Sequence, residues 1–225
     1  MKKIKSRGVI FGDMHFPLHD EGAFSCALKV IETVKPNVFI NLGDFAEGEM
    51  VSHWRWSRRK RPPLEYQLPL IDKEADEVNM HMDRIDYVLD QVGCKKRYLA
   101  MGNHDNWYNA FVEENPYLEQ YKPENLFKIK ERGYKWYPYG EIFKVEGTKL
   151  YAYHGGHYNS INHSRTTVQN LGCNIIYGHT HDCQRSVVQH ISGVHIAQSM
   201  GCLCKIKKDF LKGRKVNWTH NVGVV

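Results

Sequence analysis

The order of apolar and polar positions along the chain predicts an alternation of short strands and longer helices. Five short apolar runs have the glycine-bounded character of buried strands, and each is followed by polar residues. They cover residues 9–12, 38–43, 97–101, 150–153 and 175–178. Residues 23–34 repeat apolar positions at helical spacing, and further helices are predicted at residues 160–171 and, shorter, at residues 105–112.

The second half of the chain predicts hairpins in place of strands separated by helices. Residues 141–145 and 150–153 are expected to pair around the turn Glu146-Gly147-Thr148. Residues 116–133 form an aromatic-rich, partly helical stretch. Further short strands are predicted at residues 187–191, 194–198 and 216–225. This order predicts an α/β fold, with one mixed sheet or two stacked sheets flanked by helices.

A long helical pattern lies between the second and third predicted strands. Apolar residues recur along it at alternating steps of three and four, which makes an unbroken heptad seam. The seam consists of Leu68, Ile71, Ala75, Val78, Met82, Ile85, Leu89 and Val92. The simpler interpretation, which we favour, is that this helix packs along the body of its own domain. The alternative is that residues 68–92 also pair with a second copy in a homodimer.

Composition indicates a soluble globular protein. No linker or low-complexity run divides the 225 residues, which predicts one domain over residues 1–225, with residues 48–92 as an insertion. The mean hydropathy is −0.55 and no apolar run has the length of a membrane span, so no membrane partner is expected. The basic start, residues 1–5, leads directly into the first strand without the apolar region of a signal peptide, which favours a cytoplasmic location.

Cysteine usage and charge add two further expectations. The six cysteines are scattered without a Cys-x-x-Cys pair, which is typical of reduced, mostly buried thiols and not of a zinc knuckle. The net charge of +6 and the pI near 8.9 favour an anionic partner, although a mild basic excess is also common in proteins that bind nothing acidic.

The residues that follow the five predicted strands are of metal-ligating or acid-base types. In chain order they are Asp13 and His15, then Asp44, then Asn103, His104 and Asp105, then His154, and last His179 and His181. Ligand sites in open α/β sheets gather at the carboxyl ends of strands, so these five ends are expected to converge. Taken singly, each residue is more simply a surface carboxylate or a core histidine. The ordered set favours a metal centre, and oxygen and imidazole ligands without thiolates suit manganese, iron, nickel or zinc.

This ordered set resembles the motifs of the calcineurin-like metallophosphoesterases, most closely their small single-domain members from bacteria and phages. The motifs are Asp13-Met14-His15, Gly43-Asp44, Gly102-Asn103-His104-Asp105, His154-Gly155 and Gly178-His179-Thr180-His181, and the resemblance covers nearly the whole chain. It implies a sandwich of two mixed β-sheets flanked by helices, in four layers of order α/β/β/α. It also implies two divalent metal ions, with Mn²⁺ expected first and Fe, Ni or Zn as alternatives.

The resemblance also implies a ligand set for each ion. One ion would be held by Asp13, His15, Asp44 and His181, and the other by Asp44, Asn103, His154 and His179. Asp44 would therefore bridge two ions, which lie about 3.5–4 Å apart in hydrolytic sites of this kind. A hydroxide shared by the two ions would attack the phosphoester in line, so no protein nucleophile would be required.

His104 and Asp105 have no ligand role in the resemblance. His104, counted with Asp44 as catalytic, would protonate the leaving oxygen or stabilise the charge that develops on it. Asp105 is expected to cap the helix that follows it, in preference to a direct role in holding His104. His157 either reaches the substrate pocket or is a solvated loop residue.

The chain departs from the protein Ser/Thr phosphatase branch of that family after Gly43-Asp44. That branch continues x-x-Asp-Arg-Gly, whereas this chain reads Phe45-Ala46-Glu47-Gly48. Glu47 could still orient His104, but the arginine that grips phosphate is missing. A phosphoprotein phosphatase is therefore disfavoured.

A basic segment follows the second strand and bears on the substrate. Residues 53–61 contain five cations and two tryptophans, a combination that suits a single-stranded nucleic acid, although a solvated charge run is an equal alternative. The candidate substrate contacts are Arg55, Arg58, Arg59, Lys60 and Arg61. We expect a phosphodiesterase, with DNA or RNA as a candidate substrate. The alternatives are a hydrolase of a small phosphoester or nucleotide and, less favoured, a scaffold without catalysis.

Overall fold

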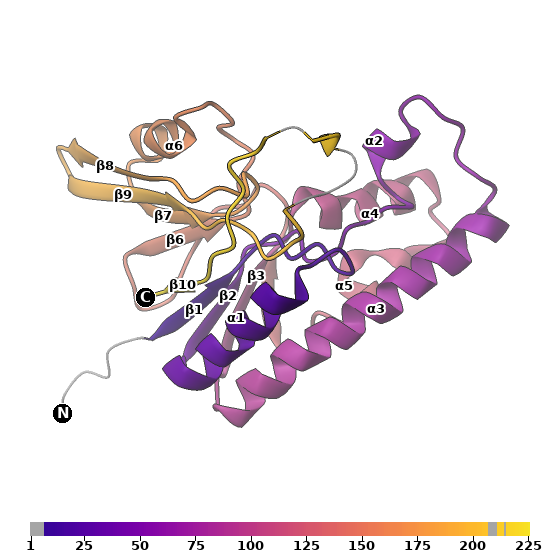
Figure 1. Cartoon of the computed structure of the whole chain (residues 1–225), viewed down its shortest axis with the longest axis horizontal. Coiled ribbons are helices and arrows are strands. Elements are labelled where there is room, and N and C mark those ends of the chain that lie inside the picture. The colour runs from indigo at the N-terminus through magenta and orange to yellow at the C-terminus, as the bar shows by residue number, and fades with distance from the viewer. Residues whose placement is uncertain (1–6, 207–210, 214) are drawn as a thin grey trace.

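The computed structural model describes residues 7–206, 211–213 and 215–225, and two sheets form the centre of this part of the chain (Figure 1). The strands β1 (Gly8–Phe11) and β2 (Val38–Asn41) are buried at every position, as the continuous apolar runs in the sequence predict. The first sheet has the order β10-β1-β2-β3-β4. Its strands are β1 (Gly8–Phe11), β2 (Val38–Asn41), β3 (Lys96–Ala100), β4 (Tyr134–Tyr137) and β10 (Gly223–Val224).

The second sheet has the order β5-β6-β7-β9-β8. Its strands are β5 (Phe143–Lys144), β6 (Leu150–Tyr153), β7 (Asn174–Tyr177), β8 (Arg185–His190) and β9 (Gly193–Ser199). In the first sheet β1 to β4 run parallel and β10 is antiparallel to β1. In the second, β6, β7 and β9 run parallel, and β5 and β8 are antiparallel edge strands. Both sheets are therefore mixed, as expected.

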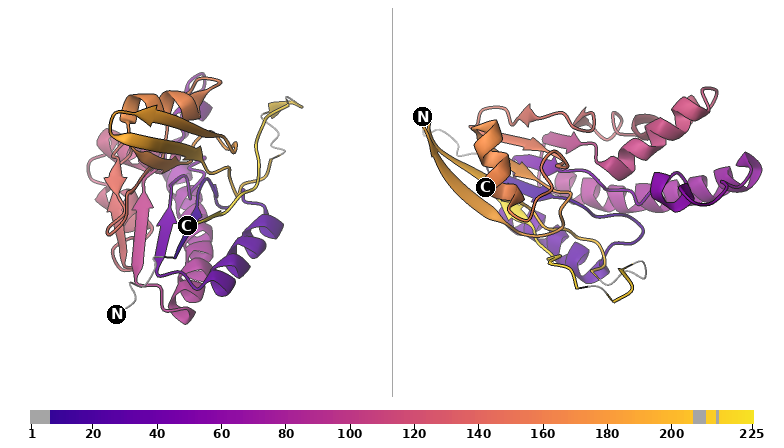
Figure 2. Two further views of the ribbon diagram at one scale, coloured as in Figure 1. Left: turned by 90° about the vertical axis from the view of Figure 1, so that its left-hand side faces the viewer. Right: turned by 90° about the horizontal axis from the view of Figure 1, so that it is seen from above.

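Helices cover the outer faces of both sheets, which gives the predicted four-layer sandwich (Figure 2). The helices are α1 (Glu21–Val34), α2 (His53–Trp56), α3 (Leu64–Gln91), α4 (Asn103–Glu114), α5 (Pro123–Leu126), α6 (His163–Leu171) and the 3₁₀ turn η1 (Glu119–Tyr121). Side chains alternate between the faces of a strand. Val9 and Phe11 of β1 accordingly pack toward the helices, whereas Ile10 packs against the second sheet. Val168 of α6 packs on the far face of that sheet.

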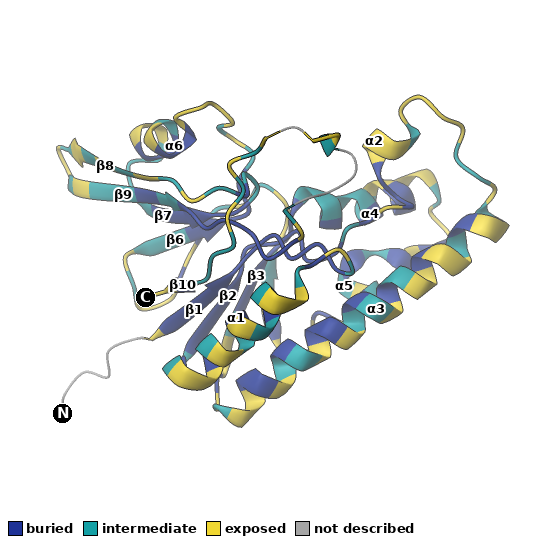
Figure 3. Ribbon diagram, viewed as in Figure 1, coloured by how far each residue is buried: buried dark blue, intermediate teal, exposed yellow. Residues whose placement is uncertain are grey.

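The apolar seam of α3 packs against other parts of the same chain. Its central residues are buried and belong to the apolar cluster between the helices and the first sheet, as the dark stripe along α3 shows (Figure 3). Val78, for example, is 0% exposed. This confirms that the helix packs along its own domain. The seam is therefore not available to a second copy, and the homodimer stays a prediction without this support.

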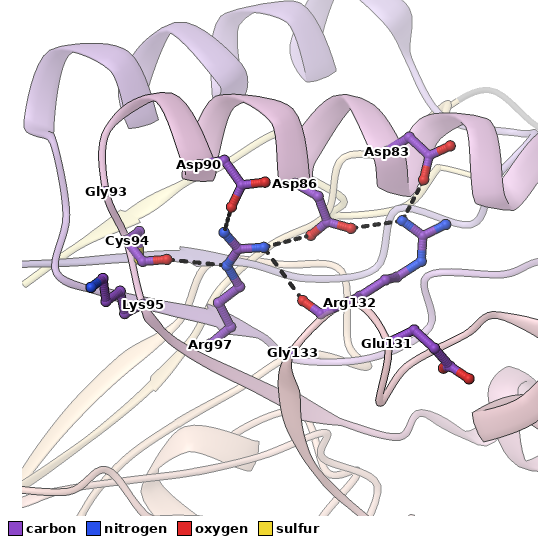
Figure 4. Close-up of a pocket in the computed structure, with 10 residues that line it drawn as sticks. All are labelled: Asp83, Asp86, Asp90, Gly93, Cys94, Lys95, Arg97, Glu131, Arg132 and Gly133. Atoms are coloured by element: carbon purple, nitrogen blue, oxygen red, sulfur yellow. Dashed lines mark hydrogen bonds and ion pairs between the residues drawn. The ribbon is translucent and has the colours of Figure 1, made fainter.

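Two arginines fasten the end of α3 to the first sheet (Figure 4). Asp86 lies between them, 3.3 Å from Nη1 of Arg97 and 2.6 Å from Nη1 of Arg132. Arg97 also pairs with Asp90, and Arg132 with Asp83 at 2.6 Å. These residues line a pocket of about 580 Å³. Because both guanidinium groups are already engaged by carboxylates and backbone carbonyls, we interpret the pocket as a structural clamp.

Two strand predictions needed correction. Residues 134–137 were not predicted as a strand, yet they form β4 at the sheet edge, where half-exposed positions break the apolar run. The strand predicted at residues 216–225 is shorter in the structure: Gly223–Val224 form β10 beside Val9 and Ile10, and His220 makes an isolated bridge with Cys202. The helix predicted at 105–112 begins earlier, so Asn103 and His104 lie in the first turn of α4.

Two expectations from the composition, on the cysteines and on membrane spans, can be compared with the structure. All six cysteines are free thiols, but only Cys94, Cys202 and Cys204 are buried, so "mostly buried" was too broad. In the part of the chain that the structure describes, none of the helices combines the length and the apolar character needed to cross a membrane.

Candidate metal centre

The loops after five parallel strands meet at one edge of the two sheets, and backbone hydrogen bonds join them. The amide of Asp13 donates to the carbonyl of Gly43 at 3.0 Å, which ties the end of β1 to the end of β2. The amide of Gly178 donates to the carbonyl of His154 at 2.7 Å, which ties β7 to β6. The amide of His179 donates to the Asp13 carboxylate at 2.9 Å and so connects the two sheets. The predicted convergence of the strand ends is therefore observed.

Four of the predicted ligands form one compact group at this edge. They are Asp13, His15, Asp44 and His181, whose candidate ligand atoms all lie within 4.8 Å of one another. Nε2 of His15 is 3.1 Å from Nε2 of His181 and 3.7 Å from Oδ2 of Asp44. Nε2 of His181 is 3.2 Å from Oδ1 of Asp13. The candidate nitrogen and oxygen ligand atoms of the four residues thus border one small volume.

A second group shares Asp44 with the first. Asp44, His154 and His179 place their candidate ligand atoms within 4.8 Å of one another, and Nε2 of His154 is 3.4 Å from Oδ2 of Asp44. The Asn103 side-chain oxygen lies beside them, 3.1 Å from Nε2 of His154 and 2.8 Å from Nδ1 of His179. The structure thus brings together the residues of the two ligand sets that the resemblance implies, with Asp44 in both groups.

The turns that present these residues have an unusual backbone. Asp13, His15, Asp44, His179 and His181 all have φ between 46° and 68°, in the left-handed region that residues other than glycine seldom adopt. Such conformations cost free energy and persist where the surroundings determine them, often at functional sites.

Two glycines of the motifs lie so close to the carboxylates that no side chain would fit. A Cβ atom at Gly102 would collide with the Asp44 carboxylate, and one at Gly178 would collide with the Asp13 carboxylate. Glycine is therefore required at both positions for the carboxylates to reach the centre.

Hydrogen bonds orient two of the histidines. Nδ1 of His154 donates to the carbonyl of Leu42 at 2.7 Å, because a carbonyl can only accept. Nδ1 of His15 lies 3.0 Å from the Glu47 carboxylate. In both rings Nε2 is thereby directed at Asp44, which is how carboxylates and carbonyls behind a metal-ligating histidine fix its tautomer.

Burial and neighbouring charges shift the pKa values of the clustered residues. Burial lowers the pKa of His154 and of His181, but the charges of Asp44 and Asp13 outweigh it and raise these pKa values to about 9 and about 10. Burial raises the pKa of Asp44, but the charges of His154, His104 and His15 outweigh it and hold that pKa well below its usual range. Burial, with the charge of His154, lowers the pKa of His179 to about 4.

The donor set fits divalent metal ions. Asp13 and Asp44 are 0% and 2% exposed, and in the described part of the chain neither pairs with a lysine or an arginine. Buried carboxylates are stable when they are paired or coordinate metals. Here their partners are imidazoles, which are themselves metal ligands, so the cluster has the chemistry of a metal centre and not of a structural ion pair.

His104 lies beside the cluster, and one of its ring nitrogens is already hydrogen-bonded within the protein. Its Nδ1 donates to the carbonyl of Glu47 at 2.6 Å, and its amide donates to Oδ1 of Asp44 at 2.9 Å. Trp107 lies against the ring, with 3.9 Å between the ring centroids. Glu47 therefore orients His104 through its backbone, while its carboxylate serves His15.

Asp105 does more than cap a helix. Its carboxylate accepts from the amide of Gly102 at 2.7 Å, at the start of α4, and also from the amides of Asp44 and Ala46 at 2.8 and 3.2 Å. It therefore fixes the turn that carries Asp44. Burial and the charge of Asp44 raise the pKa of Asp105 to about 8, against the hydrogen bonds that favour its ionised form.

The candidate substrate residues have different environments. His157 is exposed in the loop after β6. Arg55 pairs with Glu49, and Nη1 of Arg61 lies 2.5 Å from the Glu114 carboxylate at the end of α4. Arg58, Arg59 and Lys60 are exposed and have no ion pair with another described residue. These three are thus the cations of the segment that remain available.

Residues that the sequence interpretation missed complete the surroundings. Trp218, near the carboxyl terminus, contacts His181 with 4.4 Å between ring centroids, and the Cys204 thiol lies 3.8 Å from Nδ1 of His181. Tyr139 lies over His154, with 6.0 Å between ring centroids. Tyr139 follows β4, so recognising that strand would have pointed to it. No local signal marks the other two.

The fold and this cluster define an α/β sandwich protein with a candidate metal centre at its strand ends. The sequence model of the calcineurin-like phosphoesterases matches residues 7–183, and the chain belongs to that family. No curated protein sequence matches the chain.

Solved structures with similar chain traces include two sorting proteins and an enzyme. A single mutant of Vps29 from Entamoeba histolytica is 12% identical, with 90% of this chain and 77% of that one covered and a TM-score of 0.41. Vacuolar Protein Sorting 29 from Cryptosporidium parvum is 15% identical, with coverages of 88% and 74% and a TM-score of 0.39. YfcE, a phosphoesterase from E. coli, is 15% identical, with coverages of 94% and 85% and a TM-score of 0.40.

Proposed function

We propose that this protein is a hydrolase with a dinuclear metal centre that cleaves phosphodiester bonds, with single-stranded nucleic acid as the favoured substrate. The observation that carries the proposal is the sharing of Asp44 by two ligand groups, with His104 beside it. One ion would be held by Asp13, His15, Asp44 and His181, and the other by Asp44, Asn103, His154 and His179. We expect the divalent ions to be Mn²⁺ first. They would neutralise charge on the phosphoryl group and lower the pKa of a bound water, which would then act as the nucleophile.

The chain itself supplies alignment and a proton. Glu47 and Trp107 hold the His104 ring, and its Nε2 is the nitrogen that can serve the leaving oxygen. Asp105 and the left-handed turns hold Asp44 in place before substrate arrives. Such preorganisation avoids reorganisation during the reaction.

The nucleic-acid part of the proposal rests on the segment around α2. Trp54 is 74% exposed, and Arg58, Arg59 and Lys60 follow it on the surface. The segment is joined to α4, the helix that begins with Asn103 and His104, through Arg61 and Glu114. Cations next to an exposed aromatic face suit a phosphate backbone with stacked bases.

The decisive experiment compares bis-p-nitrophenyl phosphate with p-nitrophenyl phosphate, using purified protein with Mn²⁺, Ni²⁺, Zn²⁺ or Fe²⁺, and then single- and double-stranded DNA. We expect diester hydrolysis to exceed monoester hydrolysis and Asp44→Asn to abolish both. Asp44→Asn should also reduce the bound metal measured by elemental analysis. Absence of hydrolysis with all four metals would contradict the proposed hydrolase function. A preference for the monoester would favour a small phosphoester as the substrate.

A further inference from the structure

Tyr139 lies beside the candidate metal centre, in the turn after a strand that contributes no candidate ligand. It follows β4, which runs parallel to β3, in the turn Pro138-Tyr139-Gly140. The carboxyl ends of parallel strands lie at one edge of a sheet, so this turn lies at the same edge as Asn103 and His104. Tyr139 is 39% exposed, which leaves it accessible to a bound substrate.

The hydroxyl of Tyr139 lies against the turn that follows His154. A Cβ atom at Gly156 would be 2.8 Å from the Tyr139 oxygen and 3.8 Å from Nε2 of His179. The hydroxyl and a candidate metal ligand therefore border one small space, and this space is open because residue 156 is a glycine with φ of 88°.

The same hydroxyl has no internal partner. Among the residues that the structure describes, none forms a hydrogen bond with the Tyr139 oxygen. Burial and the negative charge of Asp44 both raise the pKa of Tyr139, so the hydroxyl keeps its proton at neutral pH and can donate a hydrogen bond. A hydroxyl that has no internal acceptor and lies beside the candidate metal centre can donate to an oxygen atom bound there.

We propose that the Tyr139 hydroxyl donates a hydrogen bond to a non-bridging oxygen of the substrate's phosphoryl group, an inference that rests on the proposed phosphoesterase function. No arginine follows Gly43-Asp44 to grip phosphate, and Asp13 and Asp44 have no lysine or arginine partner in the described residues. A neutral donor of this kind stabilises charge on the phosphoryl oxygens without drawing the carboxylates away from the metal ions.

The test is Tyr139→Phe, which removes one oxygen and keeps the ring. We expect kcat/KM for bis-p-nitrophenyl phosphate to fall roughly 10- to 100-fold, as for loss of a hydrogen bond to a charged group. The inhibition constant of inorganic phosphate should rise as well. Metal content and thermal midpoint should not change, because the hydroxyl is neither a ligand nor internally bonded. Tyr87→Phe, on the exposed face of α3, is the matched control and should leave every value unchanged.

The outcomes separate this inference from the proposed function. If Tyr139→Phe changes kcat/KM and phosphate inhibition less than twofold, or loses metal, the hydroxyl is not a phosphoryl donor. If the wild-type protein hydrolyses none of the esters, the proposed function fails. Calorimetric binding of inorganic phosphate to the metal-loaded protein then still tests Tyr139, because equal affinity in wild type and Tyr139→Phe overturns the inference.

Discussion

At the scale of single residues, His104 shows how neighbours define a role. The Glu47 carbonyl accepts a hydrogen bond from its Nδ1, Trp107 covers one face of the ring, and Nε2 remains available for acid-base chemistry. His104 also donates its amide to Asp44, so its position is set by the same carboxylate that both ligand groups share.

His104→Ala should keep both metal ions, because the imidazole belongs to neither proposed ligand set. We expect kcat to fall by roughly 10²–10⁴ if the ring is a general acid. The loss should shrink for p-nitrophenolate, which leaves without a proton, and grow for alkoxide leaving groups. His195→Ala, near the start of β9, is the control. An equal loss for both leaving groups rules out the acid role and leaves charge stabilisation.

The raised pKa values of His154 and His181 predict that metal binding releases protons. These values, about 9 and about 10, apply to the metal-free protein, so both rings are protonated at pH 7 and must become neutral to bind an ion. Each proposed ligand set contains one of these two histidines, so the apparent affinity for each ion should rise with pH, by roughly a factor of ten per pH unit below pH 9. Calorimetry at pH 7 in buffers of different ionisation enthalpy measures the proton count. A count near zero would show that these histidines are not ligands.

At the scale of elements, α3 shows how one amphipathic helix joins several parts of the fold. Its apolar seam packs on the first sheet, and its carboxylates hold Arg97 and Arg132 at one end. In its first half, Glu74 accepts from the amide of Gly48 and from the Tyr108 hydroxyl, which ties the loop that contains Glu47 and Gly48 to α4. The helix thereby holds the loop that contains Glu47 in place through the hydrogen bond between Gly48 and Glu74.

Val78→Asp and Met80→Asp separate the two faces of α3. Val78 is fully buried, so a carboxylate there should abolish cooperative unfolding, because the core offers it no partner. Met80 is 52% exposed, and Met80→Asp should fold normally. Circular dichroism with sedimentation measures fold and mass together. A folded Val78→Asp protein of unchanged mass would contradict the packing, and a mass change in Met80→Asp alone would indicate a dimer through the outer face.

At the scale of the whole molecule, the strand ends and the basic segment lie on connected elements. The segment follows β2 and is fastened to α4 through Arg61. Arg55 is already paired with Glu49. The structure therefore reduces five candidate cations to three for contact with an extended polyanion.

Replacing Arg58, Arg59 and Lys60 with glutamine should raise KM for a single-stranded oligonucleotide and flatten its salt dependence. Each lost phosphate contact should reduce the slope of log affinity against log salt by about 0.7. Hydrolysis of bis-p-nitrophenyl phosphate should not change, because this ester has no extended backbone. The control replaces Lys95, Lys144 and Lys149, exposed residues next to the amino ends of β3 and β6, with glutamine. Equal effects of the two triple variants would show that the segment acts only through the net charge of the protein and makes no specific contact with the oligonucleotide.

Local pattern and residue type were enough to predict the strand ends, the α3 seam and the residues that converge. This is because apolar periodicity reports burial directly, and carboxylates and imidazoles after parallel strands must reach one edge. Tertiary structure decided what depends on neighbours distant in sequence. The edge strand β4 is half exposed and lacks a pattern, so Tyr139 was invisible to sequence reasoning. Asp105 holds the Asp44 turn from 61 residues away, and Glu49 and Glu114 decide which arginines are free. Pairing of this kind is set by the folded chain and not by spacing along it.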